Sequence, residues 1–337
     1  MSSSQSAPSR TALTVAFAVI YVVWGSTYLG IRVAVDTLPP FLMAGSRFLV
    51  AGGLMVGWLT ATSGFRATAH QWRDNAVIGA FLLLGGNGLI SWAEQFIPSG
   101  MTALLVGAQP LMMVLTEWIW PGGHSPTKIT WVGLALGFAG VAWLAAPWQH
   151  AADGSLNLGG LAAILTGCVC WAFGSIYGRR VRDPAETLTA AAMQMLGGGV
   201  ALMFIALVHG DFARFAPAAV SAHSWLAFGY LIVMGSLVGF STFVWLMKHS
   251  TPTRVSTYAY VNPVVAVFLG WLILGEPVTA RTIAAAAVIV VSVAAITTQR
   301  SRGAAPKSAD PAAPAPGKPS PALDIGQRAL KVGGSSE

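Results

Sequence analysis

The sequence predicts an all-α polytopic membrane protein, with ten transmembrane helices in two inverted repeats of five. Three observations lead to this prediction. The chain is 55% hydrophobic and only 9% charged, its apolar residues form ten long runs, and motifs recur about 150 residues apart. An average soluble domain carries roughly 25% charged residues, so this composition excludes a soluble globular protein. It also excludes intrinsic disorder outside the chain ends.

Each predicted span is a mostly apolar run of about 20 residues, the length that a helix needs to cross a hydrocarbon core about 30 Å thick. Proline and glycine stand between the runs, as in Pro39-Pro40 and Glu276-Pro277. A β-barrel would instead show shorter segments of alternating polarity. The predicted spans are 12–33, 41–60, 75–96, 99–120, 128–147, 157–178, 187–208, 224–247, 255–275 and 280–299.

The distribution of Lys and Arg predicts the orientation. With a cytoplasmic N-terminus, 15 of these residues lie on the cytoplasmic side and 3 on the opposite side, while Arg47 stands inside a span. Cytoplasmic loops of membrane proteins carry such an excess, so we predict that both termini are cytoplasmic. Topology therefore accounts for the net charge of +7. The expected macromolecular environment is the lipid bilayer, and a nucleic-acid partner has no support.

The spans divide into two repeats, residues 12–147 and 157–299, between a Ser-rich N-terminus (1–11) and an Ala/Pro-rich tail (303–337), both predicted to be disordered. Gly25-Ser26-Thr27-Tyr28 in the first span corresponds to Gly174-Ser175-Ile176-Tyr177 in the sixth. Likewise, Gln109-Pro110 in the fourth span corresponds to Asn262-Pro263 in the ninth. Because each repeat has five spans, the second must enter the membrane inverted. Inverted repeats indicate an alternating-access transporter with its site near the midplane.

Three stretches resemble the EamA family of the drug/metabolite transporter superfamily: residues 24–28 (WGSTY), 98–105 (PSGMTALL) and 260–266 (YVNPVVA). The resemblance covers residues 12–299. It implies a bacterial inner-membrane location and a central cavity walled by the first, third, fourth, sixth, eighth and ninth helices. Many members end the fourth and ninth helices with Gly-Glu. This chain has Gly275-Glu276 but Gly122-Gly123 at the other position.

Charged residues inside spans are costly unless they are paired or hydrated, so Arg47 and Glu94 are candidates for gating or coupling. Their predicted depths are similar, and an Arg47–Glu94 ion pair near the outer side would lock the cavity. The alternative is that both side chains snorkel to the interface. Glu94 is also the candidate proton-coupling group, because it follows Asn87 by about two helical turns.

The predicted substrate site combines aromatic walls with amide side chains, which suits amphipathic solutes. Pro110 and Pro263 are predicted to break their helices and expose carbonyl groups beside two of these amides. The alternatives are an interfacial aromatic belt and prolines that serve packing alone. The predicted substrate-binding residues are Trp24, Tyr28, Asn87, Gln109, Trp171, Tyr177, Tyr258 and Asn262.

We therefore predict a secondary transporter that exports small organic metabolites, such as amino acids, related solutes or drugs. Uptake or exchange by the same fold remains an alternative, because sequence does not encode the direction of flux. An intramembrane enzyme would need a nucleophile–base or metal constellation within the spans, and the sequence contains no such motif and no phosphate-binding loop. No cofactor or metal is expected, and the sequence does not determine the oligomeric state.

Overall fold

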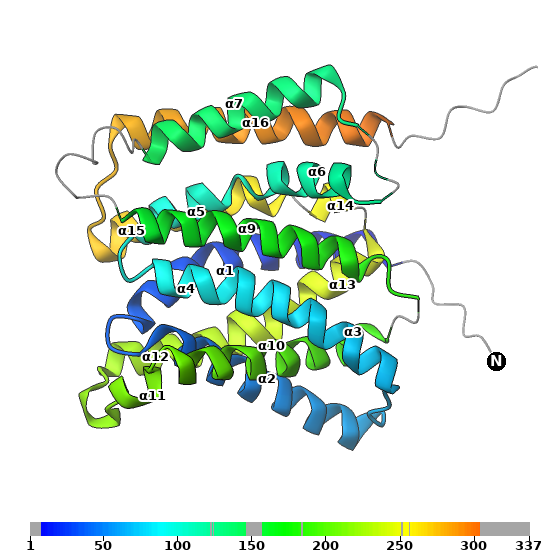
Figure 1. The fold of residues 1–337 in the computed structure, drawn as a ribbon, viewed down its shortest axis with the longest axis vertical. Helices are drawn as coiled ribbons and strands as arrows, with labels where there is room; N and C mark the ends of the chain where they lie inside the picture. Colours follow the sequence, from blue (N-terminus) through cyan, green and yellow to red (C-terminus); the bar gives the residue numbers. More distant parts are fainter. Residues whose placement is uncertain are drawn as a thin grey trace, which may run out of the picture. The chain divides into compact units, whose positions relative to one another are not determined.

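The computed structural model describes residues 8–121, 123, 125–145, 157–182, 185–250, 252–255 and 257–303, and these residues are helical without strands (Figure 1). The predicted all-α class is confirmed for them. The chain divides into two units, Met1–Arg300 and Ser301–Glu337, and the site described below belongs to the first. Residues 1–7 and 304–337, which include most of both predicted disordered ends, lie outside the described residues.

The helices coincide with the predicted spans to within a few residues. Helix α1 begins at Arg10, so the last two residues of the predicted disordered N-terminus are helical. The first half consists of α1 (Arg10–Ala34), α2 (Pro40–Thr62), α3 (Ala69–Gly79), η1 (Ala80–Gly88), α4 (Leu89–Ala93), α5 (Ser99–Val106), α6 (Gln109–Ile119) and α7 (Lys128–Ala145). The second half consists of α9 (Leu158–Gly178), α10 (Thr187–Val208), α11 (Asp211–Arg214), η2 (Pro217–Ala219), α12 (Ala222–Tyr230), η3 (Leu231–Phe240), α13 (Ser241–His249), α14 (Pro252–Val255), α15 (Tyr258–Leu274) and α16 (Ala280–Gly303).

Among the described residues, seven helical stretches are long and apolar enough to cross a membrane: Arg10–Ala34, Pro40–Thr62, Ala69–Ala93, Ser99–Ile119, Leu158–Gly178, Thr187–Val208 and Ala222–His249. Three shorter apolar helices, Lys128–Leu144, Val261–Leu274 and Ala280–Ser292, lie where the fifth, ninth and tenth spans are predicted.

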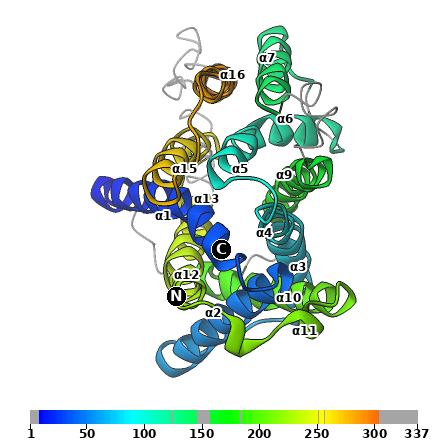
Figure 2. The same ribbon diagram turned by 90° about the vertical axis from the view of Figure 1, so that its left-hand side faces the viewer.

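Helix contacts follow the repeat. Helices α2 and α10, which occupy equivalent places in the two halves, pack against each other. Helix α1 contacts α12, η3 and α15, and its counterpart α9 contacts the equivalent segments η1 and α6. Helices α7 and α16 are also counterparts and lie at the same edge of the bundle in both views (Figure 1 and Figure 2), where Gly140 approaches Ile289.

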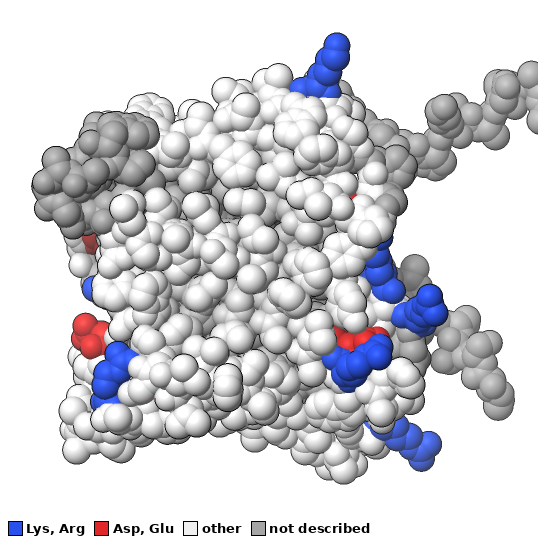
Figure 3. Space-filling model, in the orientation of Figure 1, with Lys and Arg blue, Asp and Glu red and all other residues white. Residues whose placement is uncertain are grey.

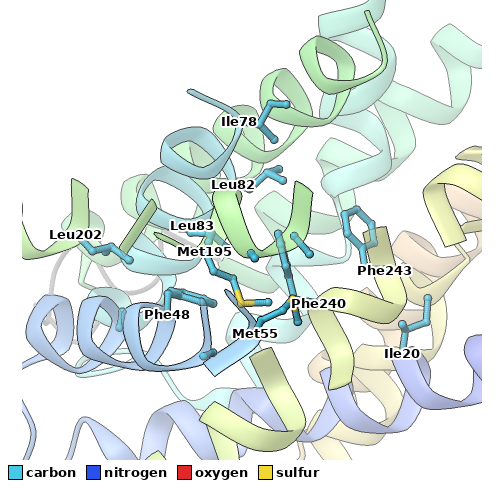
Figure 4. Close-up of a cluster of buried hydrophobic side chains, with 14 of the residues drawn as sticks. Ile20, Phe48, Met55, Ile78, Leu82, Leu83, Met195, Leu202, Phe240 and Phe243 are labelled. Atoms are coloured by element: carbon cyan, nitrogen blue, oxygen red, sulfur yellow. The ribbon is translucent and has the colours of Figure 1, made fainter. Parts of the chain in front are cut away.

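A cluster of buried apolar side chains joins helices of both halves (Figure 4). Phe48 of α2, Leu83 of η1, Met195 of α10 and Phe240 of η3 contribute to it, and each is at most 2% exposed. Because its members come from both halves, neither half can bury this cluster without the other.

Charged side chains gather at the two ends of the helices, with an almost uncharged belt between them on the face shown in Figure 3. We call one end the Lys248 end, where the chain passes through residues 62–69, 119–128, 178–187 and 248–258. The other is the Glu276 end, with residues 34–40, 93–99, 208–222 and 274–280. The belt matches what a bilayer requires, since charges inside hydrocarbon are costly.

Gly79 of α3 lies against the backbone of α10, where a Cβ atom would overlap the carbonyl oxygen of Gln194. Gly53 of α2, by contrast, has no atom within 4 Å of the equivalent position. We predict that Gly79→Ala lowers the free energy of unfolding by about 1–3 kcal/mol, because overpacking displaces one helix from another. Thermal unfolding of the purified protein in detergent micelles measures this, with Gly53→Ala as the matched control. Equal midpoints for the two variants would contradict the prediction.

Candidate functional site

A small cavity lies within the bundle and is walled by helices of both halves. It encloses about 60 Å³, room for only a few water molecules, since one needs roughly 10–15 Å³ on this measure. Its lining residues are Trp24, Thr27, Tyr28, Ile31, Arg47, Phe48, Leu83, Gly86, Asn87, Ile90, Val106, Gln109, Gly167, Trp171, Gly235, Phe240, Tyr258 and Asn262.

The structure brings seven of the eight predicted substrate-binding residues to this cavity, together with Arg47. The exception is Tyr177, whose hydroxyl donates to Asp74 Oδ1 (3.2 Å) at the Lys248 end. Tyr177 follows Trp171 by six residues on α9, which places it about 240° around the helix and about 9 Å along its axis. Both residues therefore cannot face the same small cavity, and placing Tyr177 in the cavity was wrong.

Two π-helical segments, η1 and η3, lie in the third and eighth predicted spans at equivalent places in the repeat. Each supplies cavity residues: Gly86 and Asn87 from η1, and Gly235 and Phe240 from η3. A π-helix has wider turns than an α-helix and is often found at functional sites. The sequence analysis missed both segments, although glycines recur in them at the spacing of the repeat.

An aromatic cluster closes the cavity toward the Lys248 end. The Trp24 ring centroid lies 5.6 Å from that of Trp171, 4.9 Å from Phe243 and 5.2 Å from Tyr258. The Phe243 centroid lies 5.6 Å from Trp171 and 6.2 Å from Tyr258. These are normal separations for attractive aromatic pairs. Phe243 was not a predicted site residue, because one phenylalanine among many apolar residues gives no sequence signal.

A second cavity of about 360 Å³ lies at the Lys248 end, on the other side of this aromatic cluster. A small space lies between the two cavities: it shares Trp171 and Tyr258 with the central one and Ser175 and Phe243 with the second. The second cavity is lined by Asn75, Ile78, Leu82, Gly174, Ser175, Gly178, Arg179, Val181, Ala185, Thr187, Ala190, Gln194, Phe243, Val244, Met247 and Lys248.

Arg47 projects from α2 and is only 2% exposed. Its Nε donates to Ser236 Oγ of η3 (2.8 Å), and its guanidinium carbon lies 4.7 Å from the Phe48 ring centroid. Its Nη1 has no hydrogen-bond partner. Burial therefore leaves this charged group with one guanidinium nitrogen, Nη1, without an acceptor.

The predicted Arg47–Glu94 ion pair is absent from the structure. Glu94, the residue that ends α4, is fully buried, and neither of its carboxyl oxygens has a hydrogen-bond partner. Its backbone oxygen accepts a bond from Arg32 Nη1 (2.8 Å). Arg47 is instead held beside η3 through Ser236. Snorkelling is also contradicted, because both side chains are buried inside the bundle.

The three amide side chains of the cavity differ in whether their hydrogen-bonding groups have partners. Gln109 Nε2 and Asn87 Oδ1 are buried without partners. With its amide oriented to suit its neighbours, Asn262 donates to the backbone oxygens of Tyr258 (3.2 Å) and Tyr21 (3.1 Å). Asn262 therefore joins α15 to α1, whereas Gln109 and Asn87 retain hydrogen-bonding capacity for a ligand.

The two predicted helix breaks have different outcomes. The fourth span is divided at Gly107 and Ala108 into α5 and α6, and Pro110 occupies the first turn of α6. Proline is readily accommodated there, because the first-turn N–H has no helical acceptor. Helix α15, however, runs unbroken through Pro263. The predicted interruption at Pro263 was wrong, and Pro263 lines an apolar groove with residues of α15 and α16 instead of the central cavity.

Acidic residues of the second half cap helices of the first half at the Glu276 end. Glu276 accepts bonds from Ser99 N and Gly100 N (2.8 and 2.9 Å) at the start of α5. Asp211 accepts bonds from Phe41 N and Leu42 N (2.9 and 3.0 Å) in the first turn of α2. Both helices follow a proline, which has no side chain able to cap them. These bonds fasten the two halves together at this end.

A bundle of apolar helices around a closed, partly polar cavity is the architecture of a helical membrane transporter. Residues 12–146 and 158–298 each match the EamA-like transporter family, and the chain belongs to this family. The predicted resemblance is thereby confirmed. Within the described residues, no group of three His, Cys, Asp or Glu side chains could hold a metal ion.

Two relatives show what the chain is similar to. The uncharacterized inner membrane transporter YedA of Escherichia coli (strain K12) is 37% identical over 279 residues, which cover 82% of this chain and 88% of YedA. The uncharacterized transporter YvbV of Bacillus subtilis is 27% identical over 292 residues, 86% of this chain and 92% of YvbV. The fold is also similar to that of a protein of known crystal structure, with a TM-score of 0.61. The match covers 88% of this chain and 100% of that protein's chain, at 21% sequence identity.

We predict that Glu276→Ala destabilises the protein by about 0.5–2 kcal/mol, the usual cost of losing a helix N-cap. The physical reason is that the amides of Ser99 and Gly100 lose their acceptor. Thermal unfolding of the purified protein measures the effect. Asp36→Ala is the control, since Asp36 is an exposed carboxylate at the same end. A Glu276→Ala protein as stable as the Asp36→Ala protein would show that the cap contributes nothing.

Proposed function

We propose that this transporter exports small organic solutes across the bacterial inner membrane by alternating access, as a secondary transporter without cofactors. The observation that carries the proposal is the central cavity, which both halves line and whose volume of about 60 Å³ is too small for an organic solute in this conformation. Drug-sized ligands occupy pockets of roughly 300–1,000 Å³. The cavity must therefore open to admit a solute, and inverted repeats supply a way to open it to either side in turn.

Ten spans in two inverted groups of five fit this proposal. Seven long apolar helices support seven of these spans, and the three shorter apolar helices would be the remaining three. The equivalent contacts of α1 and α9, and the matching π-helical segments, support a structural repeat. In the proposed orientation the Lys248 end faces the cytoplasm, and both termini lie there, because that end carries most of the Lys and Arg residues.

The two ends differ in ways that suggest the order of opening. The Glu276 end is fastened by hydrogen bonds to Asp211 and Glu276. Toward the Lys248 end, ring contacts of Phe243 with Trp24 and Trp171 lie between the central cavity and the larger one. Solute entering from the cytoplasm would part these rings and occupy the cavity, whose proposed binding residues are Trp24, Tyr28, Asn87, Gln109, Trp171, Tyr258 and Asn262.

Proton coupling through Glu94 completes the proposal. A charged carboxylate is costly when it is buried without a partner, so a change of surroundings during opening would be tied to the gain or loss of its proton. Glu94 is buried at the Glu276 end, where Arg32 and Glu276 lie within electrostatic range. Uptake and exchange are the rival directions of transport, and flux measurements separate them.

The proposed topology predicts the side from which introduced cysteines react. In a protein carrying Cys168→Ala and Cys170→Ala, single cysteines at Arg66 and Arg182 should resist an impermeant thiol reagent added to intact cells. A cysteine at the exposed Ala219 should react. Reaction at Arg182 together with protection at Ala219 would reverse the orientation assigned to the second half.

Reconstituted transport tests the function itself. Proteoliposomes should move at least one member of a panel of radiolabelled amino acids, sugars and cationic drugs, and an imposed pH gradient should drive its accumulation. Gln109→Leu should slow transport at least tenfold, because a buried donor to the solute is lost. Glu94→Gln should still transport downhill but lose gradient-driven accumulation.

Tyr177→Phe is the matched control for these variants, because Tyr177 lies outside the cavity. It should transport like the parent. Accumulation that survives unchanged in Glu94→Gln would remove Glu94 from coupling. A folded parent protein that moves no solute of the panel in either direction would refute the transport proposal.

A further inference from the structure

The central cavity has a positive charge and no negative one. Arg47 is its one charged lining residue, and no Asp or Glu is among the described residues that line it. Within the described part of the chain no carboxylate pairs with the guanidinium, since the carboxyl oxygens of Glu94 have no hydrogen-bond partner and Arg47 Nε donates to a serine hydroxyl. A buried charge without a counter-charge is strongly unfavourable, so the cavity is electrostatically incomplete when it is empty.

Of the three buried cavity groups without hydrogen-bond partners, two are donors and one, Asn87 Oδ1, is an acceptor. Arg47 Nη1 and Gln109 Nε2 are both buried and both lack an acceptor. A guanidinium binds a carboxylate through two parallel N–H bonds, which are among the strongest hydrogen bonds in proteins. The faces of Trp24 and Trp171 could attract a cation, but a cation in so small a space would be repelled by Arg47.

The cavity at the Lys248 end has the same sign of charge. Lys248 lines it, with no Asp or Glu among its described lining residues. On its wall, Gln194 Nε2 donates to Asn75 Oδ1 (2.8 Å), so this amide pair is already satisfied. A cleft lined by one sign of charge concentrates solutes of the opposite sign. The proposed entry route and the central cavity therefore both favour anions.

We propose that the solute carries a carboxylate, or a comparable planar anion, which Arg47 binds in the central cavity, on an apolar body that contacts the aromatic cluster. That the solute is transported rests on the proposed function, whereas binding of the anion in the cavity does not depend on it. It selects organic acids from the solutes considered above and excludes amphipathic cations that lack an anionic group.

Three probes with one aromatic body and different charges test the proposal: 3-phenylpropionate, 3-phenylpropanamide and 3-phenylpropylamine. Their binding to the full-length protein in nanodiscs is followed by tryptophan fluorescence, since Trp24 and Trp171 line the cavity. The carboxylate should bind at least tenfold more tightly than the amide and the amine. Arg47→Met should abolish this preference. Arg47→Lys should keep a weaker preference, because it retains the charge but not the planar fork.

Arg66→Met is the matched control, because it removes an equal charge from an exposed position outside both cavities. It should bind all three probes like the parent. Gel filtration verifies that each variant is folded, and Arg47→Lys serves if Arg47→Met does not fold. The proposal is overturned if the amine binds as well as the carboxylate, if the Arg47 variants keep the full preference, or if the folded parent binds none of the probes at millimolar concentration.

The binding and transport experiments can therefore refute the anion-site proposal and the transport proposal independently of each other. A protein that prefers the carboxylate in nanodiscs but moves no solute in proteoliposomes would retain the anion site and refute the transport proposal. A protein that transports the amine as fast as the carboxylate would remain a transporter without an anion site.

Discussion

Satisfaction of backbone hydrogen bonds within each helix is the constraint on which the rest of the structure depends. Hydrocarbon offers no partner to a free N–H or C=O group, so departures from α-helix are tolerated where protein surrounds them. The break at Gly107, the segment η1 and the segment η3 all lie beside buried residues of the bundle interior. Two of these departures shape the cavity directly, since η1 and η3 supply part of its wall.

The two ends of the bundle are held by different kinds of interaction. At the Glu276 end, carboxylates of the second half accept bonds from helix amides of the first half, and these bonds depend on direction and distance. At the other end of the central cavity, aromatic rings are in contact, and such contacts can be replaced by those of an apolar solute at little loss. In the proposed transporter this asymmetry would make the two ends unequal gates.

Arg47 and Glu94 are buried in one bundle without neutralising each other. Arg47 is held by Ser236 of η3, within the wall of the cavity, whereas Glu94 ends α4 beside Arg32. Isolated charges of this kind are expensive in a low dielectric, and a protein retains them where a ligand or a proton can complete them. In the proposals above, the two residues have separate roles: Arg47 binds the solute, and Glu94 gains and loses the proton.

The sequence by itself determined the all-helical class and the approximate places of the apolar segments, because span length and apolar composition are set by the bilayer and not by tertiary contacts. It also indicated part of the cavity lining, since Trp24, Gln109 and Asn262 stand in motifs that recur with the repeat. Only the tertiary structure decided which side chains meet. It placed Tyr177 outside the cavity, separated Arg47 from Glu94, and added Phe243. The physical reason is that side-chain partners depend on the rotation and close approach of helices, which here follow from glycine contacts and π-helical turns distributed over both halves.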